Sequence, residues 1–190
     1  MEHSKYDAVV VGAGPNGLSA AIVLQQAGLS VLILEAKEQI GGGLRSAELT
    51  LPGYLHDVCS AIHPLAVSSP FLKTLPLKNH GLDFVYPEVS AAHPFDNGDA
   101  AVLKGTAEET ASGLGSDAGA YLELLEPLLR KWPDLLSDIL GPLGIPDHPL
   151  DLASFGLKAL RSASAMTAKF RTEKARGLWA GMAAHSMQPL

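Results

Sequence analysis

Cysteine is almost missing from this sequence, and Cys59 is the single example in 190 residues. One thiol cannot close an intrachain disulfide, and it excludes a zinc site made of several cysteines. We therefore expect a reducing compartment, the cytoplasm by default. We expect Cys59 itself to be a small buried hydrophobic residue rather than a redox centre, because most free cysteines are buried and inert.

Positive charge is also scarce. The chain has 14 Lys and Arg against 20 Asp and Glu, a net charge of −6, whereas nucleic-acid-binding proteins usually present a basic face. We therefore expect no nucleic-acid partner. No run of about 18 apolar residues occurs, which predicts no transmembrane segment, while peripheral contact with a membrane stays open. The first residues lack the pattern of a secretory signal, and the histidines never occur at metal-ligand spacing, so we expect no metal site.

Hydrophobic residues make up 47% of the chain, enough for a substantial core. The valine-rich run 6–11 predicts a strand of a parallel sheet that is buried on both faces. Alanine, leucine and isoleucine recur at helical spacing over 18–27, and Gly28 is placed to end that helix. The apolar run 30–34 predicts a second strand. A strand, a helix and a strand in so short a span form the smallest right-handed crossover unit.

Three glycines lie where the first strand would turn into the helix. Gly12, Gly14 and Gly17 form the pattern G-x-G-x-x-G, and Glu35 follows at the end of the second strand. In such a turn the first glycine permits a tight bend, the second lets the backbone approach a pyrophosphate, and the third lets the helix pack closely on the strand. The helix N-terminus presents N–H groups and a positive dipole end to phosphates. Glu35 can accept both hydroxyl protons of an adenosine ribose and would repel a 2′-phosphate, so the pattern predicts a dinucleotide site that disfavours NADP.

A second glycine turn, Gly41-Gly42, follows Glu35 after a short segment, and Arg45 comes soon after it. An NAD domain has no need of a backbone-exposing turn at this place. A longer ligand that folds back over the first site does need one, because its second phosphate and ribityl chain require close main-chain contact. The second turn therefore favours FAD, and a simple NAD-binding dehydrogenase or reductase domain is the alternative.

The middle of the chain is expected to contain loops and short strands. Residues 52–70 predict a loop, and 82–86 are a candidate strand. Residues 91–103 predict a β-hairpin that turns at Asn97-Gly98, a pair suited to positive φ. Residues 106–109 have the form of a capping box at the start of a helix.

The last part of the chain is expected to be mostly helical, over 116–132, 152–163 and 167–184. Pro127 lies inside the first of these helices and should kink or interrupt it. Four large apolar side chains in this part are interpreted as core packing, with the lining of an apolar substrate tunnel as the alternative. They are Met166, Trp179, Met182 and Met187.

Residues 6–46 resemble the N-terminal portion of FAD-dependent oxidoreductases of the phytoene dehydrogenase-related family and, more widely, of the amine-oxidase-like flavoproteins. Ala21, Leu24 and Gly28 fall at the places that this pattern favours, the Gly-Gly turn follows, and Pro15-Asn16 is similar to the phytoene dehydrogenase-related branch. Where many relatives have an arginine directly after the Gly-Gly pair, this chain has Gly43. The resemblance is weaker after residue 65.

The resemblance implies a set of FAD-binding residues at matching positions. They are Gly12, Gly14, Pro15, Asn16 and Gly17 at the pyrophosphate, Glu35 at the adenosine ribose, Ala36 and Lys37 beside the adenine, and Gly41, Gly42, Leu44 and Arg45 along the phosphate and ribityl stretch. The loop 60–63 would approach the flavin ring through its backbone. No catalytic side chain is assigned within these residues.

The resemblance also implies an α/β fold with two parts. A Rossmann-like FAD/NAD(P)-binding βαβ unit would occupy residues 1–70 as the N-terminal part of an FAD-binding domain. A mostly helical, incomplete segment of a substrate or cap domain would follow over 71–190. The implied function is that of a desaturase- or dehydrogenase-type enzyme that oxidises a hydrophobic small molecule by hydride transfer to the flavin.

Members of this family are more than twice as long as this chain, so we expect an N-terminal fragment that lacks a C-terminal segment. Two strands are too few for a stable doubly wound sheet, and the exposed edges of an incomplete sheet favour pairing. A homo-oligomer is therefore also open. The remaining alternative is a catalytically silent, truncated nucleotide-binding fragment.

Overall fold

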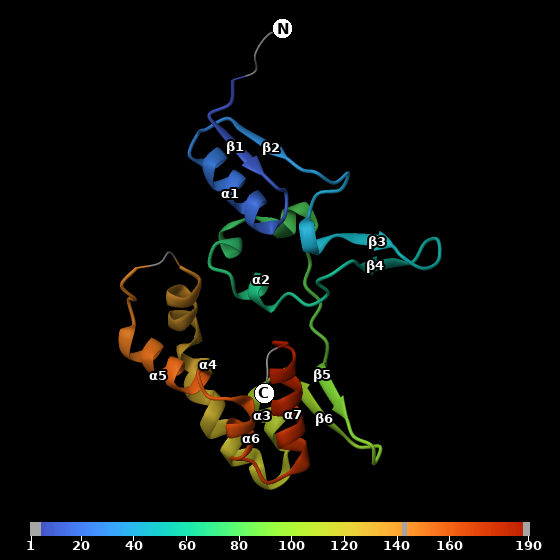
Figure 1. Cartoon of the computed structure of the whole chain (residues 1–190), viewed down its shortest axis with the longest axis vertical. Coiled ribbons are helices and arrows are strands. Elements are labelled where there is room, and N and C mark those ends of the chain that lie inside the picture. The colour runs from blue at the N-terminus through green and yellow to red at the C-terminus, as the bar shows by residue number, and fades with distance from the viewer. Residues whose placement is uncertain (1–4, 142–143, 188–190) are drawn as a thin grey trace. The chain divides into compact units, whose positions relative to one another are not determined.

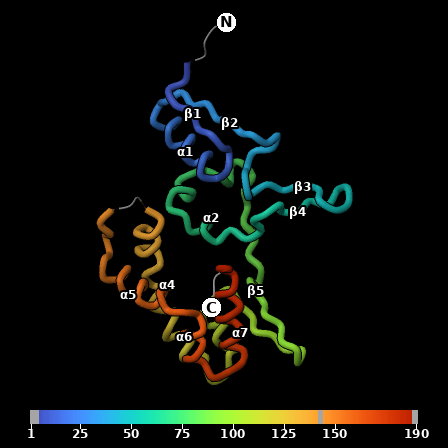
Figure 2. Tube along the Cα trace, in the orientation of Figure 1, coloured from blue at the N-terminus to red at the C-terminus, as the bar shows by residue number. Residues whose placement is uncertain are grey.

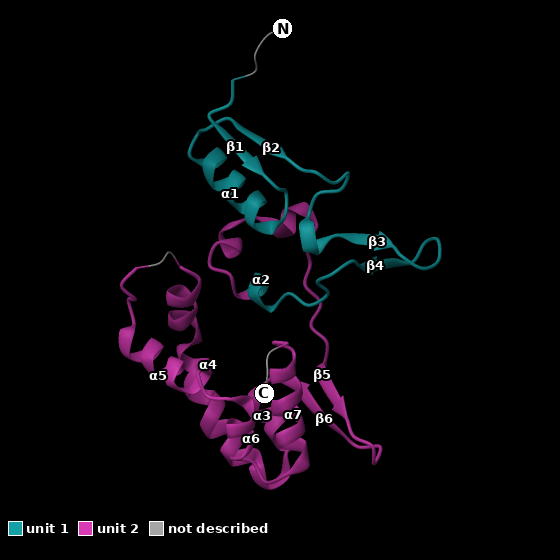
Figure 3. Cartoon of the chain, in the orientation of Figure 1, with its two compact units in different colours: residues 1–67 teal, residues 68–190 magenta. Residues whose placement is uncertain are grey.

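The computed structural model describes residues 5–141 and 144–187 and divides into two compact units, Met1–Val67 and Ser68–Leu190 (Figure 3). The path of the chain through each unit can be followed from blue to red (Figures 1 and 2). We refer to them as unit 1 and unit 2 and describe each by itself.

Unit 1 begins with a βαβ element (Figure 1). Strand β1 (Ala8–Val11) leads into helix α1 (Pro15–Gln26), and β2 (Val31–Leu34) returns parallel to β1, with Ala8 opposite Val31. Helix α1 ends just before Gly28, whose φ of +86° suits glycine. The predicted crossover unit and the α/β fold class are confirmed.

The strand pair of unit 1 is more exposed than expected. Val9 is 56% exposed and Val11 is 82% exposed, and Leu34 on the neighbouring strand is 48% exposed. The prediction that 6–11 is buried on both faces is therefore wrong for this structure. Its β1–β2 sheet has two strands, and helix α1 packs against them, which is too little cover for apolar strands of this kind.

The rest of unit 1 contains more regular structure than the predicted loop 52–70. A 3₁₀ turn, η1 (Gly42–Leu44), precedes an antiparallel pair formed by β3 (Ser46–Glu48) and β4 (Leu55–Asp57). Helix α2 (Pro64–Ser68) follows. The sequence does not reveal β4, because three residues are too few to show a periodicity. It does not reveal α2 either, because the helix is short and begins with a proline, a residue that also occurs in loops but is favoured in the first helical turn.

Unit 2 opens with two 3₁₀ turns, η2 (Leu72–Thr74) and η3 (Leu77–His80), and the hairpin of β5 (Val89–Pro94) and β6 (Ala100–Lys104). Gly98 in the hairpin turn has a φ of +84°, so the predicted hairpin is confirmed. The candidate strand 82–86 is wrong: these residues have no strand assignment, because a strand forms only where a partner strand satisfies its backbone.

Two helices follow the hairpin. Helix α3 (Ala107–Ser112) starts with the predicted capping box, in which the Thr106 hydroxyl accepts the Glu109 N–H at 3.1 Å and the Glu109 carboxylate accepts the Thr106 N–H at 2.9 Å. After the short turn η4 (Gly115–Asp117), helix α4 (Ala118–Leu140) runs without interruption through both Pro127 and Pro133. Of the kink or interruption expected at Pro127, the interruption is wrong. Leu124 before it and Leu135 after it are both buried, so packing on both sides favours one continuous helix over the local cost of proline.

The C-terminal helices begin at other residues than predicted, although the last of them ends at the expected residue, Ala184. Helix α5 (Pro149–Ala159) starts with proline at its N-terminus, ahead of the expected 152–163. Of the expected helix 167–184, only the later part is helical, as α7 (Glu173–Ala184), and the short helix α6 (Ala163–Thr167) lies just before the expected start. Ser162 and Thr172 each cap one of them by accepting a backbone N–H, from Ala165 and Ala175 respectively, and such caps define new helix starts that hydrophobic spacing does not show.

The core of unit 2 lies between β6, α3, α4, α6 and α7. Its buried members include Leu114, Tyr121 and Phe170, and the Phe170 and Trp179 rings lie 6.1 Å apart between centroids. Of the four apolar residues interpreted as core, Met166 is buried and Trp179 packs at its edge, but Met182 is 44% and Met187 89% exposed. The core interpretation is wrong for Met182 and Met187. Both come after Leu178 and Trp179, the last residues of α7 that belong to the core or pack against it.

Asp117 ties the start of α4 to the α6–α7 connection. It is 3% exposed, and its Oδ2 atom accepts the N–H groups of Arg171 at 2.7 Å and Thr172 at 2.6 Å and the Thr172 hydroxyl at 2.9 Å. A buried carboxylate with three donors is held in one geometry. These bonds join segments more than fifty residues apart along the chain.

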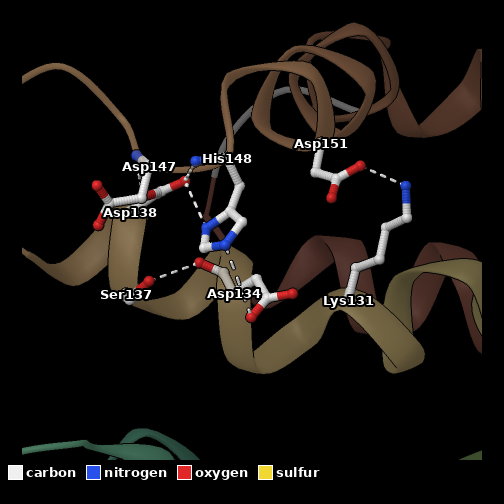
Figure 4. Close-up of polar contacts among 7 residues, drawn as sticks. All are labelled: Lys131, Asp134, Ser137, Asp138, Asp147, His148 and Asp151. Carbon is white, nitrogen blue, oxygen red and sulfur yellow. Dashed lines mark hydrogen bonds and ion pairs between the residues drawn. The ribbon is translucent and has the colours of Figure 1, made fainter.

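A second group of hydrogen bonds and ion pairs connects α4 with the start of α5 (Figure 4). The Asp138 carboxylate accepts the N–H groups of Asp147 at 3.0 Å and His148 at 2.9 Å. Figure 4 shows the His148 ring beside both Asp134 and Asp138, at 3.9 Å and 3.5 Å. Lys131 of α4 forms an ion pair with Asp151 of α5.

Within the described ranges, no helix combines the length and the apolar character needed to cross a membrane. The same part of the chain contains no group of three or more His, Cys, Asp or Glu residues placed to hold a metal ion.

We predict that Phe170→Ala lowers the free energy of unfolding of unit 2 by about 3–5 kcal/mol, because it leaves a cavity in the core where Phe170 is 1% exposed. Urea unfolding followed by tryptophan fluorescence measures this. Val85→Ala is the matched control at a 91% exposed site and should change little. A loss below about 1 kcal/mol for Phe170→Ala would contradict this core.

We predict that Asp117→Asn destabilises unit 2 in a pH-dependent way. The hydrogen bond from the Thr172 N–H is the main reason why the pKa of Asp117 lies below its ordinary value of 3.8, against the opposing effect of burial. A carboxyl with a lowered folded-state pKa contributes stability that is present above its unfolded pKa and lost as pH falls through the folded one.

The difference in melting temperature between wild type and Asp117→Asn should therefore be full near neutral pH and shrink as pH falls through and below 3.8. Circular-dichroism melts over a pH series measure it, with the exposed Asp83→Asn as the control. A difference that stays constant down to the acid end would show that the carboxylate charge is not what stabilises the connection.

Candidate dinucleotide site

The first glycine turn joins the end of β1 to the start of α1. Gly12 has a φ of +97°, and its N–H donates to the Leu34 carbonyl at 2.7 Å, which ties the turn to the end of β2. A Cβ atom on Gly17 would lie 1.9 Å from the Gly12 carbonyl oxygen. Only glycine fits at position 17, because any side chain would overlap this oxygen. The glycine pattern therefore lets the start of α1 pack directly against the turn.

The N-terminus of α1 is open to a ligand. Gly14 is the N-cap residue and Pro15 the first helical residue, and the Leu18 N–H donates to the Gly14 carbonyl at 2.9 Å. The N–H groups ahead of Leu18 have no partner within an α-helix. Pro15 and Asn16 are exposed. Together with the helix dipole, this end of α1 suits a phosphate group.

Glu35 is bound to the first turn. Its Oε2 atom accepts the Ala13 N–H at 2.7 Å and its Oε1 atom accepts the Lys37 N–H at 2.9 Å. The Ala13 bond first, and the Lys37 bond second, lower the pKa of Glu35 below its ordinary value. The carboxylate therefore stays charged to a lower pH than an ordinary glutamate does, and it has further lone pairs for hydroxyl donors.

The second glycine turn packs directly on the first. Gly41 has a φ of +111°, and Gly42 has a φ of +57°. The Gly41 N–H donates to the Ala13 carbonyl at 2.8 Å, and a Cβ atom on Gly42 would lie 3.0 Å from the Gly14 Cα atom. The two turns thus meet backbone to backbone and form one surface, which we call the cradle, and a side chain on Gly42 would press against the first turn.

Ala13 is the residue that the sequence prediction missed. It is 0% exposed, its N–H holds Glu35 and its carbonyl holds Gly41. One small residue thereby connects the ribose-binding candidate with both turns. The available signal was its size, because a larger side chain between two closely packed glycines would have no room.

Arg45 stabilises the second turn by a hydrogen bond. Its Nε donates to the Gly42 carbonyl at 2.8 Å, and its charge makes a small contribution to lowering the pKa of Glu35. Leu44 is 45% exposed at the edge of the turn, and Ala36 and Lys37 are exposed after β2. The site residues predicted from the sequence therefore lie in or beside the cradle.

The segment that follows β4 runs along the second turn. The Ser60 N–H donates to the Gly43 carbonyl at 3.0 Å, and the Val58 N–H donates to the Arg45 carbonyl at 2.9 Å. Cys59 lies between them and is exposed, so the prediction that it is buried is wrong. The backbone hydrogen bonds on either side of Cys59 hold this segment along the turn. The Cys59 thiol therefore lies outside any hydrophobic core.

Residues 10–75 match the family model described as an NAD(P)-binding Rossmann-like domain. Unit 1 is Rossmann-like. This match covers the end of β1, all of α1 and β2, both glycine turns and Glu35, which together build the cradle.

The Rossmann-like unit has longer relatives. The chain is 30% identical over 141 residues to one of the subunits of limonene dehydrogenase from Castellaniella defragrans, a match that covers 74% of this chain and 25% of that protein. It is 42% identical over 79 residues to pyridine nucleotide-disulfide oxidoreductase domain-containing protein 2 of Rattus norvegicus, which covers 41% of this chain and 13% of that protein. The chain thus spans a quarter or less of the length of these relatives.

Among solved structures, a triple mutant of putrescine oxidase with redesigned cofactor binding is similar to this chain. The TM-score is 0.48 and the sequence identity 24%, and the match covers 90% of this chain and 35% of that one.

We predict that Gly17→Ala disrupts the Rossmann-like unit, because the new Cβ would overlap the Gly12 carbonyl oxygen. We expect at least about 1–3 kcal/mol of local destabilisation, seen as faster amide hydrogen exchange over β1 and α1. Gly119→Ala is the matched control, since a Cβ there meets nothing within 4 Å and alanine favours the helix. Unchanged exchange in Gly17→Ala would contradict the close packing of the turn.

Proposed function

We propose that the Rossmann-like unit binds FAD and belongs to an FAD-dependent oxidoreductase. The observation that carries this proposal is the backbone contact between the two glycine turns, through Gly41 and Ala13 and through Gly42 and Gly14. A turn that supports only an adenosine and one pyrophosphate is complete with the first loop. A second, adjoining stretch of bare backbone suits a longer ligand that continues past the pyrophosphate.

The residues present fit this group. The first turn and the N-terminus of α1 would hold the pyrophosphate, and Glu35 would accept the adenosine ribose hydroxyls. Gly41, Gly42, Leu44 and Arg45 would lie along the ribityl stretch, and Ala36 and Lys37 beside the adenine. When bound, the flavin accepts a hydride from the substrate. The part of this chain is to bind and orient the cofactor.

The substrate that we propose is a hydrophobic small molecule. One relative is named for limonene, which is a hydrocarbon, and the resemblance to the phytoene dehydrogenase-related family favours the same class and a desaturase or dehydrogenase type of reaction. Unit 2 would then be part of the substrate or cap domain. The acidic net charge of −6 speaks against a nucleic-acid partner, and the single cysteine favours the cytoplasm.

The second candidate is a simple NAD-binding domain, which the description of the matching family model favours. In that case the second glycine turn would only hold the first turn in its conformation. Both candidates disfavour NADP, because the Glu35 carboxylate would repel its 2′-phosphate.

Titration of the chain with FAD, NAD⁺ and NADP⁺ by calorimetry separates the candidates. We expect FAD to bind most tightly and NADP⁺ most weakly. Tighter binding of NAD⁺ than of FAD would support the second candidate, and no binding of any of them would support a silent fragment.

We predict that Glu35→Gln weakens FAD binding about 10- to 100-fold, because hydrogen bonds to a charged group contribute about 1.5–3 kcal/mol. Glu38→Gln is the matched control, since Glu38 is exposed in the same loop and has no assigned contact with the ligand. The same calorimetric titration measures both variants. Equal affinity in Glu35→Gln and wild type would contradict the role of Glu35 at the ribose.

A further inference from the structure

Positive charge is concentrated near the end of this acidic chain. Residues 158–187 contain six Lys and Arg and a single acidic residue, Glu173, although the whole chain has a net charge of −6. The rest of the chain is therefore strongly acidic. This separation creates a local field that attracts anions to one part of unit 2.

A cavity of about 510 Å³ opens within this basic segment, between α5, α6 and α7. Met166 and Trp179 form an apolar lining together with Ala163, Ala183 and the half-exposed Met182. Lys158 and Arg161 lie on the same lining. Its size falls in the range of pockets that hold small ligands, which is about 300–1,000 Å³.

The two cations of this α5–α7 cavity have no carboxylate partner in the described part of the chain. The carboxylate contacts in the described residues are instead made by Lys131, His148 and Lys174, none of which lines this cavity. A second cavity of about 470 Å³, near Tyr121, contains both Lys104 and Glu108, so its charges oppose each other. Only the α5–α7 cavity of these two combines an apolar lining with charge of one sign.

We propose that the α5–α7 cavity binds a single-chain amphiphilic anion, of which a long-chain carboxylate is the simplest form. The hydrocarbon chain would lie against Met166 and Trp179, and the carboxylate would meet Lys158 and Arg161. Burial of the hydrocarbon supplies the affinity, and the two cations select for a negative head group. This site uses none of the cradle residues in unit 1, so its test does not depend on FAD binding there.

Trp179 provides the readout, because it lines the cavity and Trp132 can be replaced by Phe to remove the other tryptophan. The Trp132→Phe chain is titrated with dodecanoate below its micelle-forming concentration. We expect a saturable change in Trp179 fluorescence. Dodecanol and dodecyltrimethylammonium, with the same chain and a neutral or cationic head, should bind more weakly than dodecanoate.

The double variant Lys158→Gln/Arg161→Gln should bind dodecanoate about fivefold more weakly, as expected for the loss of two partly exposed ion pairs. Lys169→Gln is the matched control, because Lys169 is an exposed cation of the same segment that does not line the cavity. Its affinity should equal that of the Trp132→Phe chain.

Three results would overturn the proposal. The first is no saturable response to dodecanoate, and the second is equal affinity for the cationic amphiphile or in the double variant. The third is binding to anionic phosphatidylglycerol vesicles without binding to monomeric dodecanoate, which would assign the basic segment to a membrane surface instead of a ligand cavity.

Discussion

Two backbone turns in direct contact are the constraint on which the candidate site depends. The Gly41 N–H binds the Ala13 carbonyl, while the Ala13 N–H holds the Glu35 carboxylate. The strand, the helix N-terminus, the acid and the second turn are thereby fixed against one another through one buried alanine. Because most of these contacts are made by main-chain atoms, the cradle keeps its form with few side chains, and the N–H groups of the first turn of α1 are left for a phosphate.

In unit 2, hydrogen bonds also connect segments that are distant along the chain. Here the acceptors are side-chain carboxylates, whereas the two glycine turns of unit 1 meet through their backbones. Asp117 binds the α6–α7 connection, and Asp138 binds the start of α5. Each is a carboxylate that satisfies backbone N–H groups at a helix end, where such groups would otherwise be unpaired. Among the helices that they join, α5, α6 and α7 line the α5–α7 cavity. The acidic residues thus stabilise the fold, whereas the basic residues at the cavity are left for a ligand.

The sequence was most informative where local chemistry determines the structure. The crossover unit, the hairpin turn at Gly98 and the capping box after β6 follow from positive φ, hydrophobic spacing and hydrogen-bonding side chains within a few residues of one another. Contacts over long distances were not predictable from spacing. The continuity of α4 through Pro127 depends on packing at both of its ends, and the exposure of Cys59 depends on the pairing of Ser60 with Gly43. Ala13 shows the same limit, since its role requires three segments to meet.

The central claim is that both glycine turns form one binding surface for FAD. Amide chemical shifts of the ¹⁵N-labelled chain, recorded during titrations with FAD and with NAD⁺, test it most directly. We predict that FAD shifts the amides of residues 12–17 and 41–45 together, with one affinity, whereas NAD⁺ shifts mainly 12–17. Shifts by FAD that are confined to 12–17, or that are the same as those caused by NAD⁺, would contradict it.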